Sequence, residues 1–320
     1  MIAADISDMS DKPVQRAGAR PSLRVLVVGF PRLAAHIAEL LAGPDVQARF
    51  LHRRAVLSVP FVDAVYQVGG GPIVPRRLLT ACRLFGRTAV KHWVGSDVMR
   101  LHEDRVRRQI DLGFVHNFAV APWLGEELRE AGVRADVVPL SPIGDEPELP
   151  LPAAPFTVLS YLPDHKFEFY GGPAVYAAAE ALPDVRFLVV GGDGVHHVAP
   201  SNVTTLGTIG DMSSIYARTH VLLRFPQHDG LSYMVLEALN SGRHVVWNHP
   251  IATGRLALTP DDVVLRVREL RDDFAAGALM VNDGGRQHVR ETYGRETVRR
   301  RIIAAIRAAV AAETKGSVTT

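Results

Sequence analysis

The chain has one cysteine, Cys82, in 320 residues, and it has no long apolar run. A single thiol excludes an intrachain disulfide framework and fits a reducing compartment. Residues 1–22 are polar and lack the apolar segment of a secretory signal, so we expect a disordered tail there. No segment is long enough to span a bilayer. These absences together predict a cytoplasmic protein.

The charge balance excludes further classes of protein. Lys and Arg number 36 against 34 Asp and Glu, a net charge of +2, and no motif interleaves basic with aromatic residues, so no nucleic-acid partner is expected. The sequence has no His/Cys ligand cluster and no Asp-x-Asp motif, so no metal site and no bound cofactor are expected. The strand expected at 23–30 contains Gly29 but no Gly-x-Gly-x-x-Gly, which weakens a dehydrogenase interpretation.

Each half of the chain alternates short β-branched runs with segments of helical period, which is typical of a mainly parallel sheet covered by helices. In the first half, strands are expected at 23–30, 48–52, 64–68, 88–93, 117–121 and 135–140, with helices at 32–41, 74–85, 105–112 and 124–131. In the second half, strands are expected at 156–161, 185–190, 202–207, 220–225 and 245–247, with helices at 172–181, 212–217 and after 232. The sequence therefore predicts an α/β protein with two Rossmann-like domains that face each other across a cleft.

A proline-rich stretch at 146–155 marks the boundary, because it cannot continue a helix. We expect an N-terminal domain at 23–141, a linker at 142–154 and a C-terminal domain at 155–294. The apolar spacing at 295–312 predicts a terminal helix, which either crosses back to the first domain or packs on its own. Residues 313–320 are expected to be a loose end.

The segment from His228 to Leu239 carries the clearest functional pattern. A turn containing Gly230 and Leu231 leads into an apolar helix, so the backbone N–H groups from Gly230 to Tyr233, Ser232 included, are expected to face a phosphate. Asp229 and Glu237 lie eight residues apart and offer carboxylates to sugar hydroxyls. An anion site beside hydroxyl acceptors predicts a bound nucleotide. The alternative is structural: Asp229 caps the helix, and Glu237 sits in its first turns.

Four further motifs precede this one in a fixed order. They are a strand followed by Lys166, a strand followed by Gly-Asp-Gly at 192–194, Asn-Val-x-x-Leu-Gly at 202–207, and Tyr-Ala at 216–217. The whole series, over about 155–250, resembles the donor domain of family 4 of the retaining glycosyltransferases, whose Glu-x7-Glu motif matches 229–237. This resemblance implies the GT-B fold, a nucleotide-diphosphate sugar as donor, a hydroxyl group as acceptor, and catalysis without a metal ion.

The resemblance also implies roles for individual residues. Lys166 would stabilise the leaving diphosphate, Asp229 would contact the donor sugar, and Glu237 would bind the ribose. The arginine that the family pairs with the lysine is missing here, and Arg224 or His228 are the candidates to compensate for it. The catalytic set is then Asp97, Lys166 and Asp229. The expected donor-binding residues are Gly192, Gly207, Ile209, Arg224, His228, Gly230, Leu231, Ser232, Tyr233 and Glu237. Two positions depart from the family pattern: Asp229 replaces a glutamate, and Ser160 with Tyr161 replaces an arginine.

The acceptor is expected at the ends of the N-terminal strands, near Gly29 and the segment His92–Asp97. Asp97 is a candidate to orient or deprotonate an acceptor hydroxyl, Trp93 to offer its ring to a sugar, and Ser96 to hydrogen-bond the acceptor. The alternative is that Trp93 is a core residue and that Gly95, Ser96 and Asp97 turn the chain.

Two further alternatives stay open. Arg76, Arg77, Arg83 and Arg87 alternate with leucines, which fits either a helix that touches anionic lipid at the inner face of the membrane or an ordinary solvated helix. The departures at 229 and 160–161 are also compatible with a noncatalytic binding protein of the same fold. Asp97 and His228 are the candidate acid and base of a further alternative, a nucleotide-sugar epimerase.

Overall fold

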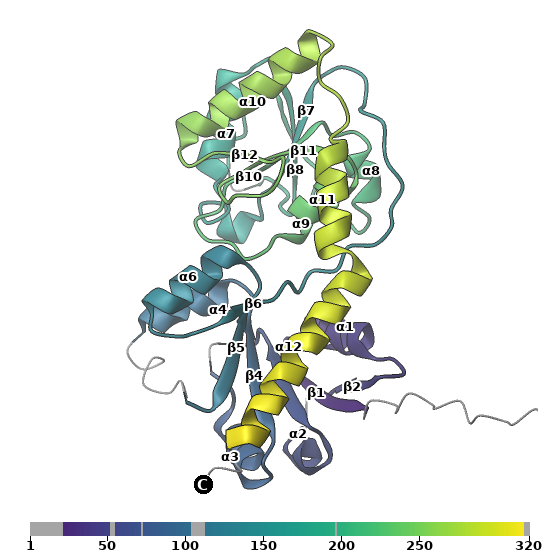
Figure 1. Cartoon of the computed structure of the whole chain (residues 1–320). Helices are drawn as coiled ribbons and strands as arrows, with labels where there is room; N and C mark the ends of the chain where they lie inside the picture. Colours follow the sequence, from purple (N-terminus) through teal and green to yellow (C-terminus); the bar gives the residue numbers. More distant parts are fainter. Residues whose placement is uncertain (1–21, 52–54, 72, 104–112, 196, 317–320) are drawn as a thin grey trace, which may run out of the picture.

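The structure, a computed structural model, describes residues 22–51, 55–71, 73–103, 113–195 and 197–316. It contains two six-stranded sheets, in the strand orders β2-β1-β3-β4-β5-β6 and β12-β11-β10-β7-β8-β9. The pairings between neighbouring strands are parallel in both sheets. Figure 1 shows each sheet with its own helices, one domain above the other. The predicted α/β architecture is confirmed.

In the N-terminal sheet β1 lies between β2 and β3. It is buried on both faces, because Val25 and Val27 alternate with Leu26 and Val28 and give the strand two apolar faces. Its strands are β1 (Leu23–Gly29), β2 (Val46–Phe50), β3 (Ala64–Val68), β4 (Thr88–Trp93), β5 (Val115–Ala119) and β6 (Asp136–Val137). Its helices are α1 (Pro31–Leu41), α2 (Ala55–Ser58), η1 (Val59–Phe61), α3 (Arg76–Leu84), α4 (Ser96–Met99), η2 (Arg100–His102) and α6 (Pro122–Glu130). The helix expected at 105–112 lies outside the described residues.

The C-terminal sheet repeats this plan with β7 and β10 at its centre. Its strands are β7 (Thr157–Tyr161), β8 (Arg186–Val190), β9 (Val203–Thr205), β10 (Val221–Arg224), β11 (His244–Trp247) and β12 (Arg255–Leu256). Its helices are η3 (Asp164–Lys166), α7 (Gly172–Ala181), α8 (Ser213–Tyr216), α9 (Tyr233–Asn240), α10 (Pro260–Ala275) and α11 (Asp283–Tyr293). Helices α7 and α10 pack together on one face of the sheet, and α9 packs with α11 on the other.

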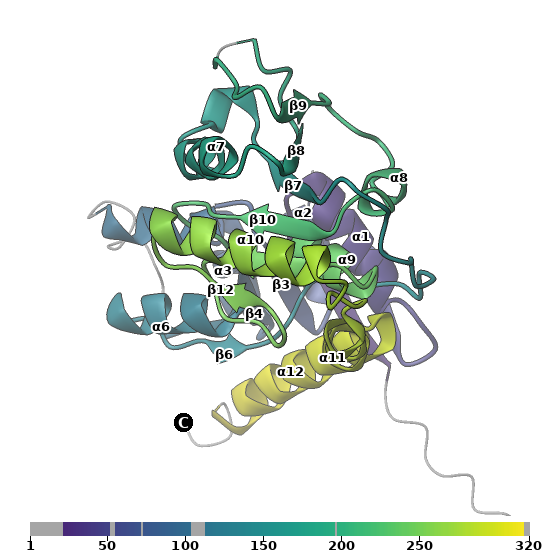
Figure 2. The same ribbon diagram turned by 90° about the horizontal axis from the view of Figure 1, so that it is seen from above.

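The terminal helix α12 (Arg295–Gly316) follows α11 directly and runs along the N-terminal domain (Figure 2). It packs against α1 and β4. An ion pair supports this position, since Arg299 Nη2 lies 2.7 Å from Asp45 Oδ1, and Arg307 donates to the carbonyl of Asp45 at 3.0 Å. The last helix of the chain therefore bridges the two halves.

The proline-rich segment between the sheets is held by side chains of the C-terminal domain. Arg243 donates to the carbonyls of Leu149 and Pro150. Arg286 and Arg290 both donate to the carbonyl of Glu146. Since the backbone oxygens of this segment have side-chain donors, it needs no sheet or helix of its own.

Candidate functional site

The two domains touch through the loops that the sequence assigned to donor and acceptor. A Cβ atom on Gly230 would lie 2.1 Å from the carbonyl oxygen of Val94, in the turn after β4. From the other side, a Cβ on Gly95 would lie 3.4 Å from the backbone nitrogen of Gly230. Only glycine at position 230 allows the two backbones to approach this closely. The motif at 228–239 therefore lies at the carboxyl edge of the N-terminal sheet.

Helix α9 begins next to this contact with uncapped backbone donors. Ser232 is its N-cap residue, but the Ser232 side chain makes no capping hydrogen bond. The N–H of Leu236 donates to the carbonyl of Ser232. Within the described ranges, the N–H groups of Tyr233, Met234 and Val235 have no hydrogen-bond partner. Three such donors at the positive end of a helix dipole can hold an anion.

Arg224 and Asp229 form an ion pair beside the start of α9. Arg224 Nη2 lies 3.0 Å from Asp229 Oδ1, and Nε lies 2.5 Å from Oδ2. The Arg224 guanidinium also lies 5.4 Å from the centroid of the Tyr170 ring. β10 places Arg224 at its carboxyl end, and the following turn returns Asp229 to it. In this state each group neutralises the charge of the other.

Glu237 lies on α9 and accepts a hydrogen bond from Tyr216 of α8, with Tyr216 Oη 2.8 Å from Glu237 Oε2. Burial raises the pKa of Glu237; the bond from Tyr216 opposes this shift, and the charge of Glu146 adds to it. Tyr216 was expected only as part of a family motif. Its role as the partner of Glu237 depends on how α8 packs against α9, which no local pattern specifies.

The loops after β7 and β8 are built around Asp164. Its carboxylate accepts hydrogen bonds from the N–H groups of Asp193, at 2.8 Å, and Gly194, at 3.2 Å. Gly192 is required here, because a Cβ atom would lie 2.6 Å from the carbonyl of Leu162. Lys166, in the same loop, is exposed, and its Nζ lies 5.7 Å from the Phe169 ring centroid. An exposed cation thus lies beside an ordered glycine loop.

Asp97 is buried, and both of its carboxylate oxygens have partners. Oδ2 lies 2.7 Å from Lys91 Nζ, while Oδ1 accepts from the N–H groups of Val94 at 3.1 Å and Gly95 at 3.0 Å. Burial lowers the pKa of Lys91, and the charge of Asp97 opposes that shift. The carboxylate therefore fixes the turn that Gly230 contacts. These contacts fit the structural alternative for Asp97, and its role toward an acceptor hydroxyl stays a prediction.

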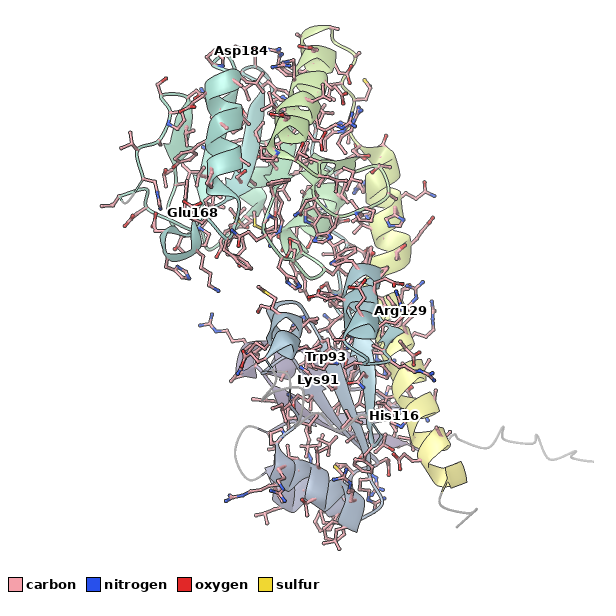
Figure 3. The ribbon with its side chains drawn as sticks, turned by 90° about the vertical axis from the view of Figure 1, so that its left-hand side faces the viewer. Lys91, Trp93, His116, Arg129, Glu168 and Asp184 are labelled. Atoms are coloured by element: carbon pink, nitrogen blue, oxygen red, sulfur yellow. The ribbon has the colours of Figure 1, made fainter. Side chains whose placement is uncertain are left out.

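The prediction that Trp93 offers its ring to a sugar is wrong in this structure. Trp93 is completely buried, and its Nε1 donates to Asn117 Oδ1 at 3.0 Å. Figure 3 shows Lys91 and Trp93 inside the N-terminal domain, with Glu168 in the other domain across the junction. The reason is that helices cover both faces of this parallel sheet. A side chain on β4 is therefore buried whichever face it points to, and the indole fills the core.

The remaining expected residues take several positions. Ser96 is exposed at the start of α4. Gly29 has φ +127°, and a Cβ there would lie 2.0 Å from the carbonyl of Val68, so its role in the structure is a tight strand end. Gly207 accepts from the N–H of Gly191 at 2.8 Å, which joins the loops after β8 and β9. Ile209 is half-buried, and Leu231 is buried in the core.

Residues of α6 that the sequence did not single out contact the loop before α9 from the N-terminal domain. Trp123 Nε1 donates to the carbonyl of Asp229 at 2.9 Å, and the Trp123 ring stacks on His249 with centroids 4.5 Å apart. His228 Nε2 lies 2.9 Å from Glu127 Oε2. Its other ring nitrogen, Nδ1, is buried without a hydrogen-bond partner in the described part of the chain, and the expectation that His228 replaces the missing arginine stays a prediction.

Comparison with known proteins establishes the fold. No protein-family model matches the chain, and no curated protein matches its sequence. Among solved structures, Anabaena HepE in complex with UDP-glucose is similar, with TM-score 0.69, 12% identity, and coverage of 89% of this chain and 100% of that one. The sucrose-phosphate synthase of Thermosynechococcus elongatus has TM-score 0.65 at 13% identity, covering 91% and 100%. The galactosyltransferase WaaB has TM-score 0.64 at 11%, covering 89% and 99%. The chain has the GT-B fold.

Ser160 and Tyr161, which stand where the resembling family has an arginine, both make contacts within the C-terminal domain. Ser160 is buried, and its hydroxyl donates to the carbonyl of Leu223 at 2.9 Å. The ring of Tyr161 meets Tyr170 edge-on, with centroids 5.0 Å apart. Tyr170 in turn lies below Arg224. At the end of β7, where the resembling family has its arginine, Tyr161 thus packs with Tyr170, which lies against Arg224 of β10.

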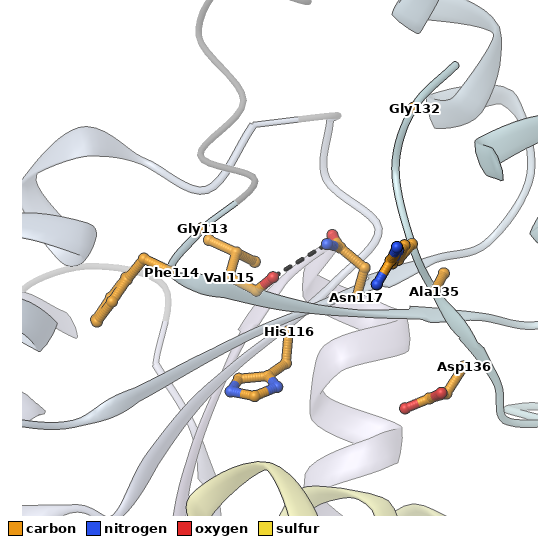
Figure 4. Close-up of a pocket in the computed structure, with 9 residues that line it drawn as sticks. Gly113, Phe114, Val115, His116, Asn117, Gly132, Ala135 and Asp136 are labelled. Atoms are coloured by element: carbon orange, nitrogen blue, oxygen red, sulfur yellow. Dashed lines mark hydrogen bonds between the residues drawn. The ribbon is translucent and has the colours of Figure 1, made fainter. Parts of the chain in front are cut away.

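A hollow of about 490 Å³ lies elsewhere in the GT-B fold, along β5 and β6 (Figure 4). Its lining includes His116, Arg134 and Asp136, but none of the expected donor residues.

Among the described residues, no three His, Cys, Asp or Glu side chains are grouped to hold a metal ion. In the same part of the chain, no helix has the length and apolarity to cross a bilayer.

Proposed function

We propose that this chain is a glycosyltransferase of the retaining family 4 type, which moves a sugar from a nucleotide-diphosphate donor to a hydroxyl acceptor without a metal ion. The observation that carries the proposal is the uncapped start of α9. Its N–H groups at 233–235 follow closely after Asp229, the ion-pair partner of Arg224, and precede Glu237 by about one helical turn. An anion site next to a carboxylate suits a diphosphate that continues into a ribose.

Under this proposal each group has one task. The N–H groups at 233–235, with Arg224 and Lys166, stabilise the negative charge that grows on the diphosphate. Glu237 accepts hydrogen bonds from the ribose hydroxyls, and Asp229 accepts one from the donor sugar. Gly192, Gly207 and Ile209 border the nucleotide. As the bond from the sugar to the diphosphate breaks, its electron pair passes to the leaving group. The acceptor oxygen forms the new bond to the anomeric carbon on the same face, and the diphosphate takes the proton of that hydroxyl.

The acceptor site would lie above the turn held by Asp97, with Ser96 as its exposed hydroxyl. Asp97 itself is better suited to hold Gly95 against Gly230 than to act as a base, because both of its oxygens are occupied. The proposal includes a glycan, lipid-linked or small-molecule acceptor and a cytoplasmic location. It leaves Gly29 as a structural element of the acceptor loop.

The bound ligands of similar structures suggest the first donor to test. HepE was solved with UDP-glucose, and the pneumococcal GtfA with UDP and GlcNAc. We therefore propose a UDP-sugar, with a hexose as the transferred group. The test is a hydrolysis and transfer assay over UDP-, GDP-, ADP- and dTDP-hexoses, with and without a chelator, and with the product anomer read by NMR. Chelator-resistant turnover that retains the anomeric configuration supports the proposal; product of inverted configuration contradicts the mechanism.

A noncatalytic nucleotide-binding protein of the same fold is the second candidate. The observation in its favour is the Arg224–Asp229 ion pair, which leaves neither charge free for a donor in this state. Tight diphosphate binding without turnover of any hexose donor would favour it. A nucleotide-sugar epimerase is less well supported, because it requires acid and base groups that face the sugar, whereas Asp97 is paired with Lys91 and His228 Nε2 with Glu127.

A further inference from the structure

One face of the N-terminal domain carries large apolar side chains in solvent. Leu57 is 69% exposed, Phe61 64%, Leu84 75% and Phe85 44%. They come from α2, η1 and the end of α3, three elements that pack against one another. We call this surface the α2–α3 face. Exposed apolar groups gathered on one surface mark a site of interaction.

The buried side chains of α2, η1 and α3 hold these three elements together, so their exposed side chains form one surface. Ala55, Val59, Leu78 and Cys82 are buried together under the sheet, and burial raises the pKa of the Cys82 thiol to about 12. Arg87 donates to the carbonyl of Pro60 at 3.0 Å, which fixes η1 beside the residues after α3. Arg87 was expected as a surface cation; it is half-buried and has this structural role instead.

The chain segment that forms this surface carries mostly positive charge, while Glu313 of α12 adds a negative charge near Cys82. Between residues 46 and 96 the only acidic residue is Asp63, and it pairs with Arg24 at 2.7 Å. Three exposed arginines lie on α3 beside the apolar groups: Arg76, Arg77 and Arg83. The Arg83 guanidinium lies 4.7 Å from the Phe114 ring centroid. The α2–α3 face is thus both basic and apolar.

We propose that the α2–α3 face binds the surface of an anionic lipid bilayer. Arginines attract lipid phosphates, and leucine and phenylalanine side chains enter the region between headgroups and acyl chains. A second copy of the chain fits less well, because a twofold contact would place this positive face against itself. Figure 1 shows α2 and α3 at the end of the N-terminal domain away from the C-terminal domain, so a bilayer there leaves the start of α9 open. The inference does not depend on the proposed function.

Flotation with lipid vesicles tests the proposal on the full chain. The wild type is expected to float with vesicles that contain phosphatidylglycerol and not with phosphatidylcholine alone. Arg76→Gln with Arg77→Gln should weaken partition on the order of 30-fold, because each arginine near an anionic surface contributes several-fold. Leu84→Ser with Phe85→Ser should weaken it roughly tenfold or more, since two apolar groups no longer enter the bilayer.

Matched variants separate this surface from charge in general. Arg218→Gln with Arg268→Gln makes the same change of charge at exposed positions of the C-terminal domain, and Val198→Ser removes an exposed apolar group there. These controls should bind vesicles as the wild type does, and circular dichroism checks that every variant is folded. Absence of binding to anionic vesicles, or equal losses in the control pair, overturns the proposal. A dimer in sedimentation equilibrium that Leu84→Ser with Phe85→Ser dissolves would replace it with self-association.

Discussion

Arg224 holds the carboxylate of Asp229 through two hydrogen bonds, and the two side chains are only 12% and 11% exposed. A pair this well shielded is stronger than one at the surface, because water screens it less. In the proposed reaction, a diphosphate would compete with Asp229 for Arg224. Its arrival would release the carboxylate toward the donor sugar.

This competition predicts opposite effects of two substitutions. Asp229→Asn should tighten the binding of a nucleotide diphosphate, because Arg224 loses its internal anion, while turnover of the sugar donor falls. Arg224→Gln should weaken binding by about 1.5–3 kcal/mol, the usual contribution of a hydrogen bond to a charged group. Isothermal titration calorimetry measures both. Equal weakening by the two variants would show that the ion pair only stabilises the fold.

The pH dependence of nucleotide binding should depend on Glu237. The proposed ribose contact needs the carboxylate form, so affinity should fall as the pH drops through the pKa of Glu237, which burial raises above its ordinary value of 4.5. Tyr216→Phe removes the bond that opposes this rise. The acidic loss of affinity should therefore move to higher pH in Tyr216→Phe and disappear in Glu237→Gln.

The raised pKa of Glu237 also determines how this residue makes the free energy of unfolding depend on pH. The native state holds the proton of Glu237 more tightly than the unfolded chain, so this group favours folding at low pH, and that contribution is lost as the pH rises through its native pKa. Glu237→Gln should remove this dependence. Urea unfolding across the acidic range measures it, and a loss of stability toward acid that vanishes in Glu237→Gln would contradict the assignment.

Asp97 offers a direct choice between a structural role and a role as base. Removing one partner of a buried pair leaves the other charge uncompensated, so Asp97→Ala should lower the free energy of unfolding by about 3–5 kcal/mol. The folded fraction of the variant should keep most of its kcat. Loss of a general base would instead cost about 10²- to 10⁴-fold in kcat. Unfolding and steady-state kinetics on the same samples decide between them.

The contact between the domains predicts a strict need for Gly230. An alanine there places a Cβ atom 2.1 Å from the carbonyl of Val94, so the loop or the turn must move. Gly230→Ala should separate the domains and destabilise the chain by about 1–3 kcal/mol. Gly210→Ala is the control, because nothing lies within 4 Å of its Cβ position. Small-angle scattering that is unchanged in Gly230→Ala would refute this contact.

The sequence predicted most strands because a parallel strand buried on both faces is a short β-branched run. The strands expected at 64–68 and 88–93 match β3 and β4 in full. Helices α10 and α11 were not predicted, although α10 has a capping box at Thr259 and Asp262 that was available as a signal. Polar and small residues dominate α11, and Val289 is its one aliphatic side chain, so a search for repeated apolar residues does not find it.

The site was less predictable than the fold. The start of α9 and its glycine followed from one local motif, and the structure places both at the contact of the domains. Partners from distant elements did not follow from any motif: Lys91 for Asp97, Glu127 for His228 and Tyr216 for Glu237. Trp93 was a candidate to stack on a sugar, with a core position as the alternative, and its complete burial decides for the core.

The central claim is that the start of α9 binds the diphosphate of a nucleotide sugar. The most direct test is calorimetry with UDP, GDP, ADP and dTDP, each with and without magnesium, on the wild type and on Glu237→Ala. The account predicts that one diphosphate binds the wild type, that magnesium does not change its affinity, and that Glu237→Ala loses it. Failure of all four to bind, or undiminished binding by Glu237→Ala, would contradict the account.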